Sequence, residues 1–393
     1  MKKVFIFLLS IFSLSIARTK LVALPEREIS YIRFDAPNTA FVEEERTLTL
    51  QKGINQVDFS WKGVNIDQDS ITLTFITNPD KLKLINLSYP PEGNSLVWEI
   101  YSPEGGEEKI RISYLLSNID CIYTYKIVVD KNEENINFSS YLIIRNFSGE
   151  DFEKGIFTPE FGKTFETSTK NEETKQILIY QKDGIKFEKI FVFDASKMIW
   201  DPERVKENVG IPVYFEIKNL KESGLGEFPL LTGKTRMFQI DKSDSFIFLG
   251  EDNLKYTPIG DSFRLYFGDS RDIIVKQKKM KETRINVRKN NLGNIVLYDT
   301  DEVIRIEIEN FRDRPAKIEI LENIPDEWDM EESTHKYEKI DSNNIKFVID
   351  LKPKSKEIVE FHYHRRNLRK KEIVNFSSPI KGEIIETLPF KGE

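Results

Sequence analysis

Three residues near the carboxyl end of the chain have types and a spacing that could bind a metal ion. Glu360, His362 and His364 alternate with apolar residues, so in a strand their side chains would share one face, about 7 Å apart. Two imidazoles and a carboxylate are a plausible ligand set for zinc. The intervening apolar residues, which would form the buried face, are Val359, Phe361 and Tyr363. We favour a solvated polar strand face and keep a metal site at Glu360, His362 and His364 as the alternative.

Other residues that could support catalysis lack the neighbours that catalysis requires. Residues 231–235 (Leu-Thr-Gly-Lys-Thr) are similar to the end of a phosphate-binding loop, but Phe228 occupies the position of its first glycine and a strand-like segment follows. No Gly-x-Ser-x-Gly motif accompanies the histidines, of which the third is His335. Cys121 lies in the strand-like segment 118–129 and is predicted to be a buried structural thiol. We therefore assign no catalytic residue and no cofactor.

The elements that would position these residues are predicted to be β-strands, because apolar and polar residues alternate along much of the chain. Residues 303–309 place three isoleucines on one face and charged residues on the other, and segments 109–114 and 345–351 repeat the pattern. Strands with one buried face are typical of antiparallel sheets. Helical periodicity is rare, with 196–208 as the best candidate, and no heptads predict a coiled coil.

The chain is therefore predicted to be mainly β, with two or three antiparallel β-sandwich units of immunoglobulin-like type, less than about 15% helix and no coiled coil. Turn-forming residues divide it into an N-terminal β domain (21–104), a central β domain (107–297), a C-terminal immunoglobulin-like sandwich (298–366) and a polar tail (367–393). We expect segment 298–366 to fold by itself, although it is short for an independent core.

The first 17 residues have the pattern of a secretory signal peptide. A short positive segment is followed by an apolar run of roughly 13 residues and a Ser-Ile-Ala cleavage site that ends at Ala17. The run is shorter than the ~20 residues that span a bilayer as a helix. We expect an exported, extracytoplasmic protein, periplasmic or cell-surface, which would contact a membrane only through an uncleaved leader.

The net charge of the chain bears on which partners it could bind, and its cysteine content bears on what stabilises its fold. The chain has 58 basic and 65 acidic residues, so its net charge of −7 gives no electrostatic reason to bind nucleic acid. It has one cysteine, so no disulfide can form within the chain and stability must come from hydrophobic cores.

Several short motifs occur in a fixed order between residues 107 and 366. They include Asn-Phe-Ser-Gly-Glu-Asp-Phe at 146–152, Gly-Leu-Gly-Glu-Phe-Pro-Leu-Leu-Thr-Gly-Lys at 224–234, Phe-Leu-Gly-Glu-Asp-Asn at 248–253 and Asp-Glu-Trp at 326–328. In order and spacing this region resembles the DUF-4139 domain, the C-terminal part of mucoidy-inhibitor-A-like exported bacterial proteins, and residues 42–73 more weakly resemble the N-terminal domain of that family. Relatives commonly place a long coiled coil between the two domains, whereas residues 86–106 contain no heptads. The resemblance implies an extracytoplasmic β protein and identifies no catalytic residue.

Two functions from different classes follow from these observations. The first is a non-catalytic binding or structural role in the cell envelope, with an envelope protein or polysaccharide as partner. The alternative is a secreted hydrolase that acts on envelope polysaccharide through carboxylates that converge only in the folded chain. A deep cleft with two carboxylates roughly 5–10 Å apart would favour the hydrolase.

Overall fold

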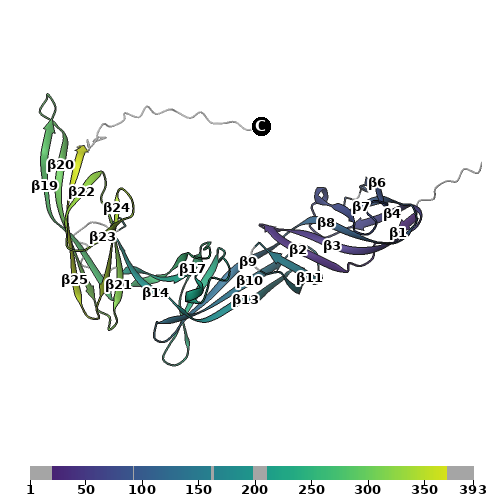
Figure 1. Cartoon of the computed structure of the whole chain (residues 1–393), viewed down its shortest axis with the longest axis horizontal. Coiled ribbons are helices and arrows are strands. Elements are labelled where there is room, and N and C mark those ends of the chain that lie inside the picture. The colour runs from purple at the N-terminus through teal and green to yellow at the C-terminus, as the bar shows by residue number, and fades with distance from the viewer. Residues whose placement is uncertain (1–19, 92, 161–162, 198–209, 370–393) are drawn as a thin grey trace, which may run out of the picture. The chain divides into compact units, whose positions relative to one another are not determined.

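The computed structural model describes residues 20–91, 93–160, 163–197 and 210–369 (Figure 1). About 68% of the structure is strand and about 2% is helix, which confirms the prediction of a mainly β fold without a coiled coil. Helix in the described residues is limited to the 3-10 turns η1 (Gln68–Ser70) and η3 (Lys221–Ser223). No helix in this part of the chain is long and apolar enough to cross a membrane. The predicted leader lies outside the described residues, as does the predicted helix at 196–208 except for a turn at Ser196 and Lys197.

The chain forms two compact units, each built from two stretches of sequence. The first comprises Met1–Glu188 and Tyr214–Gly268, and the second comprises Lys189–Val213 and Asp269–Glu393. This division differs from the predicted ranges 21–104, 107–297 and 298–366. Residues from the first two ranges share one hydrophobic core, and residue 298 falls inside a strand. Turn residues mark the ends of strands whether or not a core ends there, which explains the difference.

The first unit begins with two sheets that pack around a shared core. One sheet has the order β1 (Lys20–Val22), β4 (Gly53–Ser60), β7 (Ser95–Ser102) and β6 (Lys83–Ser88). The other has the order β12 (Phe165–Thr169), β11 (Phe152–Pro159), β2 (Ile29–Ala36), β3 (Thr39–Leu50), β8 (Gly106–Ser117) and β5 (Thr72–Phe75). The ring centroid of Phe59 lies 5.6 Å from that of Trp98 in its own sheet and 6.1 Å from that of Tyr114 in the facing sheet. The apolar faces that alternation predicts thus meet in one sandwich core.

A third sheet of the first unit contributes to two cores. Its strands, in spatial order, are β13 (Glu173–Lys186), β10 (Asn135–Asn146), β9 (Ile119–Val129), β16 (Gly233–Ile240) and β17 (Phe246–Leu254). One end of β10 adds Leu142 and Ile144 to the sandwich core. The other end adds Ile136 and Phe138 to a second core, which also receives residues from β15 (Ile211–Lys218) and β18 (Ser262–Ser270).

The second unit confirms the alternation that the sequence shows at 303–309 and 345–351. One sheet has the order β19 (Ile273–Lys289), β20 (Ile295–Asn310), β25 (Lys356–Arg369) and β22 (Glu327–Ser333). The strands β14 (Glu188–Asp194), β21 (Ala316–Asn323), β24 (Asn344–Leu351) and β23 (Tyr337–Lys339) lie side by side in this order in a second sheet. The rings of Phe347 in β24 and Phe361 in β25 lie 5.3 Å apart, so the two sheets share a core. The predicted polar tail begins within β25, which includes residues 367–369.

Candidate functional site

The residues of the predicted metal set lie in β25 and contact β20. Glu360 accepts a hydrogen bond of 2.7 Å from Nε of Arg305. Nδ1 of His364 lies 2.9 Å from Oδ1 of Asp301, and Nε2 of His362 lies 3.8 Å from the same oxygen. The structure therefore places both histidines near Asp301, whereas Glu360 pairs with Arg305. Among the described residues, no group of three or more His, Cys, Asp and Glu side chains is arranged to hold a metal ion.

The segment that is similar to a phosphate-binding loop begins β16, where the backbone approaches a neighbouring strand closely. Gly233 pairs in parallel with Tyr123 of β9, and a Cβ at Gly233 would lie 2.3 Å from the Tyr123 carbonyl oxygen. The glycine is thus required for strand packing. Cys121 lies on β9 as a free thiol, and burial raises the pKa of that thiol to about 12, so it stays protonated and unreactive at neutral pH.

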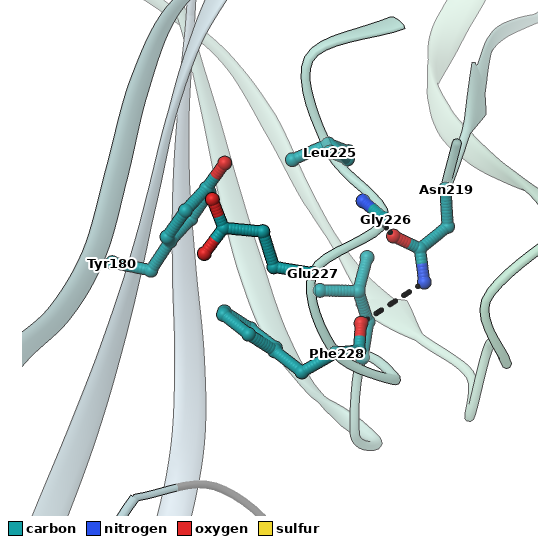
Figure 2. A pocket seen from close by; sticks show the side chains of 7 residues that line it. Tyr180, Asn219, Leu225, Gly226, Glu227 and Phe228 are labelled. Carbon is teal, nitrogen blue, oxygen red and sulfur yellow. Dashed lines mark hydrogen bonds between the residues drawn. The ribbon is translucent and has the colours of Figure 1, made fainter. Parts of the chain in front are cut away.

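One hollow of the first unit is filled by the protein itself, around a buried asparagine. Asn219 accepts a hydrogen bond from the backbone N–H of Gly226 and donates one to the carbonyl of Phe228 (Figure 2). The Tyr180 hydroxyl donates to the Gly224 carbonyl at 2.9 Å. The space between these groups does not admit a water-sized molecule, so the loop at 224–230 is closed upon itself and offers no binding site.

A second hollow of the first unit is open and has a volume of about 280 Å³, near the lower end of the range for ligand pockets. We call it the Phe147 hollow, and its lining residues are Asn38, Asn118, Asp120, Arg145 and Phe147. Strand pairing brings these residues together from three parts of the sequence. The turn between β2 and β3 meets the turn between β8 and β9, and β9 then pairs with β10.

The ring of Phe147 is exposed between two buried neighbours in the sequence. Asn146 and Ser148 are fully buried, whereas Phe147 between them is 51% exposed. Oδ1 of Asn146 accepts hydrogen bonds from both the N–H and the hydroxyl of Ser148, and Nδ2 donates to the Glu150 carbonyl at 2.8 Å. The N–H of Phe147 donates to the Asn118 carbonyl at 2.8 Å. Hydrogen bonds thus fix the backbone on both sides of Phe147 and leave its ring half-exposed.

Beside this ring, an aspartate and an arginine form a bidentate ion pair across β9 and β10. Nε and Nη2 of Arg145 donate to the two carboxylate oxygens of Asp120 at 2.8 and 2.5 Å. The Asp120 carboxylate raises the pKa of Arg145 further through these hydrogen bonds. In the part of the chain that the structure describes, no hydrogen bond engages Nη1 of Arg145. The pair therefore has a bidentate geometry, has no net charge and retains a free donor at Nη1 of Arg145.

Two asparagines complete the rim of the Phe147 hollow at tight turns. Asn38 and Asn118 have φ angles of 56° and 62°, in the left-handed region that asparagine tolerates better than most residues. The N–H of Asn118 donates to the Asn38 carbonyl at 3.0 Å, and Nδ2 of Asn38 donates to Oδ1 of Asn118 at 3.4 Å. The turns thus add amide donors and acceptors to the rim.

The chemistry of the Phe147 hollow is that of recognition. It presents an aromatic face, amide groups and a neutralised ion pair, and its lining includes one carboxylate, which Arg145 engages through both oxygens. It contains no histidine, serine or cysteine among its lining residues. These groups can bind a polar ligand with an apolar face, but they supply neither a nucleophile nor a free general base.

None of the candidate site residues named from the sequence lies in this hollow. The motif at 146–152 contains Phe147, but exposure of this ring depends on the burial of Asn146 and Ser148, which periodicity does not predict. Asp120 and Arg145 are 25 residues apart, and only the β9–β10 register places them opposite each other. The chain matches no model of a known protein family and no curated protein.

Proposed function

We propose that this chain is an exported, mainly β protein of the cell envelope with a non-catalytic binding role, and that the Phe147 hollow is its binding site. The observation that supports this most directly is the exposed ring of Phe147, which lines the same hollow as the bidentate Asp120–Arg145 pair. Exposed aromatic residues that are held in place bind with little loss of conformational entropy. A rim of satisfied polar groups then provides specificity.

The extracytoplasmic location rests on two sequence features. Residues 1–17 have the order of charges and apolar residues of a signal peptide, and the motifs between 107 and 366 resemble the DUF-4139 domain of exported bacterial proteins. An envelope protein or polysaccharide is the partner that this location provides. Membrane contact would come only from a leader that is not removed.

The geometry of the Phe147 hollow supports binding over the alternative of a secreted hydrolase. Glycoside hydrolysis usually requires two carboxyl groups that flank the bond, one of them with a raised pKa. The hollow contains only Asp120, and both of its carboxylate oxygens accept hydrogen bonds from Arg145. The filled hollow near Asn219 also has one carboxylate in its lining, Glu227.

Co-sedimentation with envelope fragments of the producing cell tests the proposal. The full chain is expected to sediment with the fragments, and Phe147→Ala is expected to weaken this binding about tenfold, since an aromatic contact at a binding centre contributes 1 kcal/mol or more. Phe311→Ala is the matched control, because Phe311 is 45% exposed and likewise follows a buried asparagine, Asn310. Equal binding by Phe147→Ala and the wild type would refute the assignment of the site.

A further inference from the structure

We infer that the ligand of the Phe147 hollow is a neutral saccharide with two adjacent hydroxyl groups, a conclusion that rests on the proposed binding function. A sugar ring has an apolar face of C–H groups and an edge of hydroxyl groups. The hollow offers a complementary surface for each of these, and the two surfaces lie side by side within about 280 Å³.

The aromatic face provides the first half of the match. Phe147 is 51% exposed and its backbone is fixed by the hydrogen bonds of Asn146, so an aromatic ring projects into solvent from a fixed position of the chain. The face of an aromatic ring carries partial negative charge, which attracts the weakly positive C–H groups of a pyranose face. A branched aliphatic side chain would offer similar apolar area without this flat, negative face.

The ion pair provides the second half of the match. A hydroxyl group both donates and accepts hydrogen bonds. One hydroxyl can donate to an unused lone pair of the Asp120 carboxylate while its neighbour accepts from Nη1 of Arg145. Because the two side chains already bind each other through 2.8 and 2.5 Å contacts, they offer a donor and an acceptor at a fixed separation. This arrangement suits two adjacent hydroxyl groups better than one isolated group.

Charge determines which saccharides fit. The Asp120–Arg145 pair has no net charge, and a sugar acid that approached Arg145 would also meet the Asp120 carboxylate. The chain as a whole has a net charge of −7, which further disfavours an anionic polymer. The amides of Asn38 and Asn118 add neutral donors and acceptors at the rim. The site is therefore suited to a neutral sugar.

Selective treatment of the envelope distinguishes a saccharide from a protein partner. Periodate cleaves carbon–carbon bonds between adjacent hydroxyl groups, whereas protease digestion leaves them intact. We expect the full chain to bind protease-treated fragments as well as untreated ones, and to lose about tenfold or more in affinity after periodate treatment. Binding that survives periodate but not protease would overturn the saccharide assignment and leave the proposed binding function standing. Absence of binding to untreated fragments would refute both.

Substitutions at the two halves of the site provide the second readout. Phe147→Tyr keeps a flat aromatic face and is expected to bind protease-treated fragments within about threefold of the wild type, whereas Phe147→Leu is expected to lose about tenfold. Arg145→Lys keeps the charge but removes the bidentate geometry, and a similar loss is expected. Circular dichroism and thermal melting of each variant establish that it is folded. Equal binding by Phe147→Leu and Phe147→Tyr would contradict the role of the aromatic face.

Discussion

Four buried asparagines connect loops to the ends of strands through hydrogen bonds to backbone groups. Asn55, Asn146, Asn219 and Asn310 are each 1% exposed or less, and each bonds to backbone groups on both sides of its amide. An amide can both donate to carbonyl groups and accept from N–H groups, which a carboxylate or a hydrocarbon cannot do. These residues therefore complete the hydrogen bonding that sheets leave unfinished at their edges.

Removal of one such amide should cost much more stability than removal of an exposed one. Asn219→Ala would remove the side-chain acceptor of the Gly226 N–H and the amide donor to three carbonyl groups, those of Phe228, Thr257 and Pro258. We expect a loss of about 2–4 kcal/mol in the free energy of unfolding, measured by urea titration. Asn86→Ala, at an exposed position of β6, is the control and should change stability by less than about 0.5 kcal/mol. Equal effects of the two substitutions would contradict the structural role of Asn219.

A buried carboxyl group in the second unit should make stability depend on pH. Burial raises the pKa of Glu322 from 4.5 to about 8, and Nε2 of Gln277 donates to this carboxyl at 2.7 Å. Between these two pH values the folded chain holds a proton that the unfolded chain has lost, so stability falls as pH rises from 4.5 to about 8. Glu322→Gln keeps the acceptor and removes the ionisation. The variant should gain roughly 1–3 kcal/mol relative to the wild type at pH 8 and little at pH 4.5. A stability difference that does not change with pH would show that Glu322 is not protonated in the folded chain.

At the scale of elements, one glycine controls the parallel pairing of β16 with β9. A Cβ at Gly233 would lie 2.3 Å from the carbonyl oxygen of Tyr123, so β16 would have to move away from its neighbour. We expect Gly233→Ala to lower the unfolding free energy by about 2–4 kcal/mol. Gly293→Ala is the control, because this turn residue has a φ of 80° and no atom within 4 Å of an added Cβ. Its cost should be about 1 kcal/mol, from backbone conformation alone. A smaller loss for Gly233→Ala than for the control would mean that the two strands can separate without cost.

The predicted C-terminal sandwich at 298–366 should not fold by itself. Its first strand, β20, begins at Ile295 and pairs along its length with β19, which lies outside this segment. The segment also lacks β14, which pairs in parallel with β21. We expect an isolated 298–366 peptide to give poorly dispersed NMR spectra, because the exposed sheet edges and core faces lose their partners. Well-dispersed spectra would instead support a domain boundary at residue 298, as the turn residues predicted.

Local patterns predicted the strands well and the pairing of strands poorly. The buried faces at Ile304, Ile306 and Ile308 follow directly from period-two alternation. Alternation does not distinguish parallel from antiparallel neighbours, so the parallel pairs of β1 with β4 and of β16 with β9 could not be predicted. The Phe147 hollow depends on this same long-range information, because its residues come from two turns and two strands that only the register joins.

At the scale of the whole molecule, the location of the chain is the property that most constrains its partner. The leader pattern predicts that export removes residues 1–17 and that the mature chain begins at Arg18. N-terminal sequencing of protein recovered outside the cytoplasm measures this directly. A chain that retains Met1 and fractionates with membranes would show that the segment serves as an anchor, and the Phe147 hollow would then act at a membrane surface.

The buried asparagines also affect how the protein ages. Asparagine deamidates when the backbone nitrogen of the next residue attacks its side chain, a reaction that makes asparagine a thermolabile residue. After Asn146 that nitrogen belongs to Phe147 and is bonded to the Asn118 carbonyl at 2.8 Å, and after Asn310 it belongs to Phe311 and is bonded to the Asp272 carbonyl at 2.9 Å. In both places the hydrogen bond orients the backbone nitrogen toward a carbonyl group of another segment, not toward the asparagine side chain. The hydrogen bonds that shape these turns thus also protect Asn146 and Asn310 from deamidation for as long as the chain stays folded.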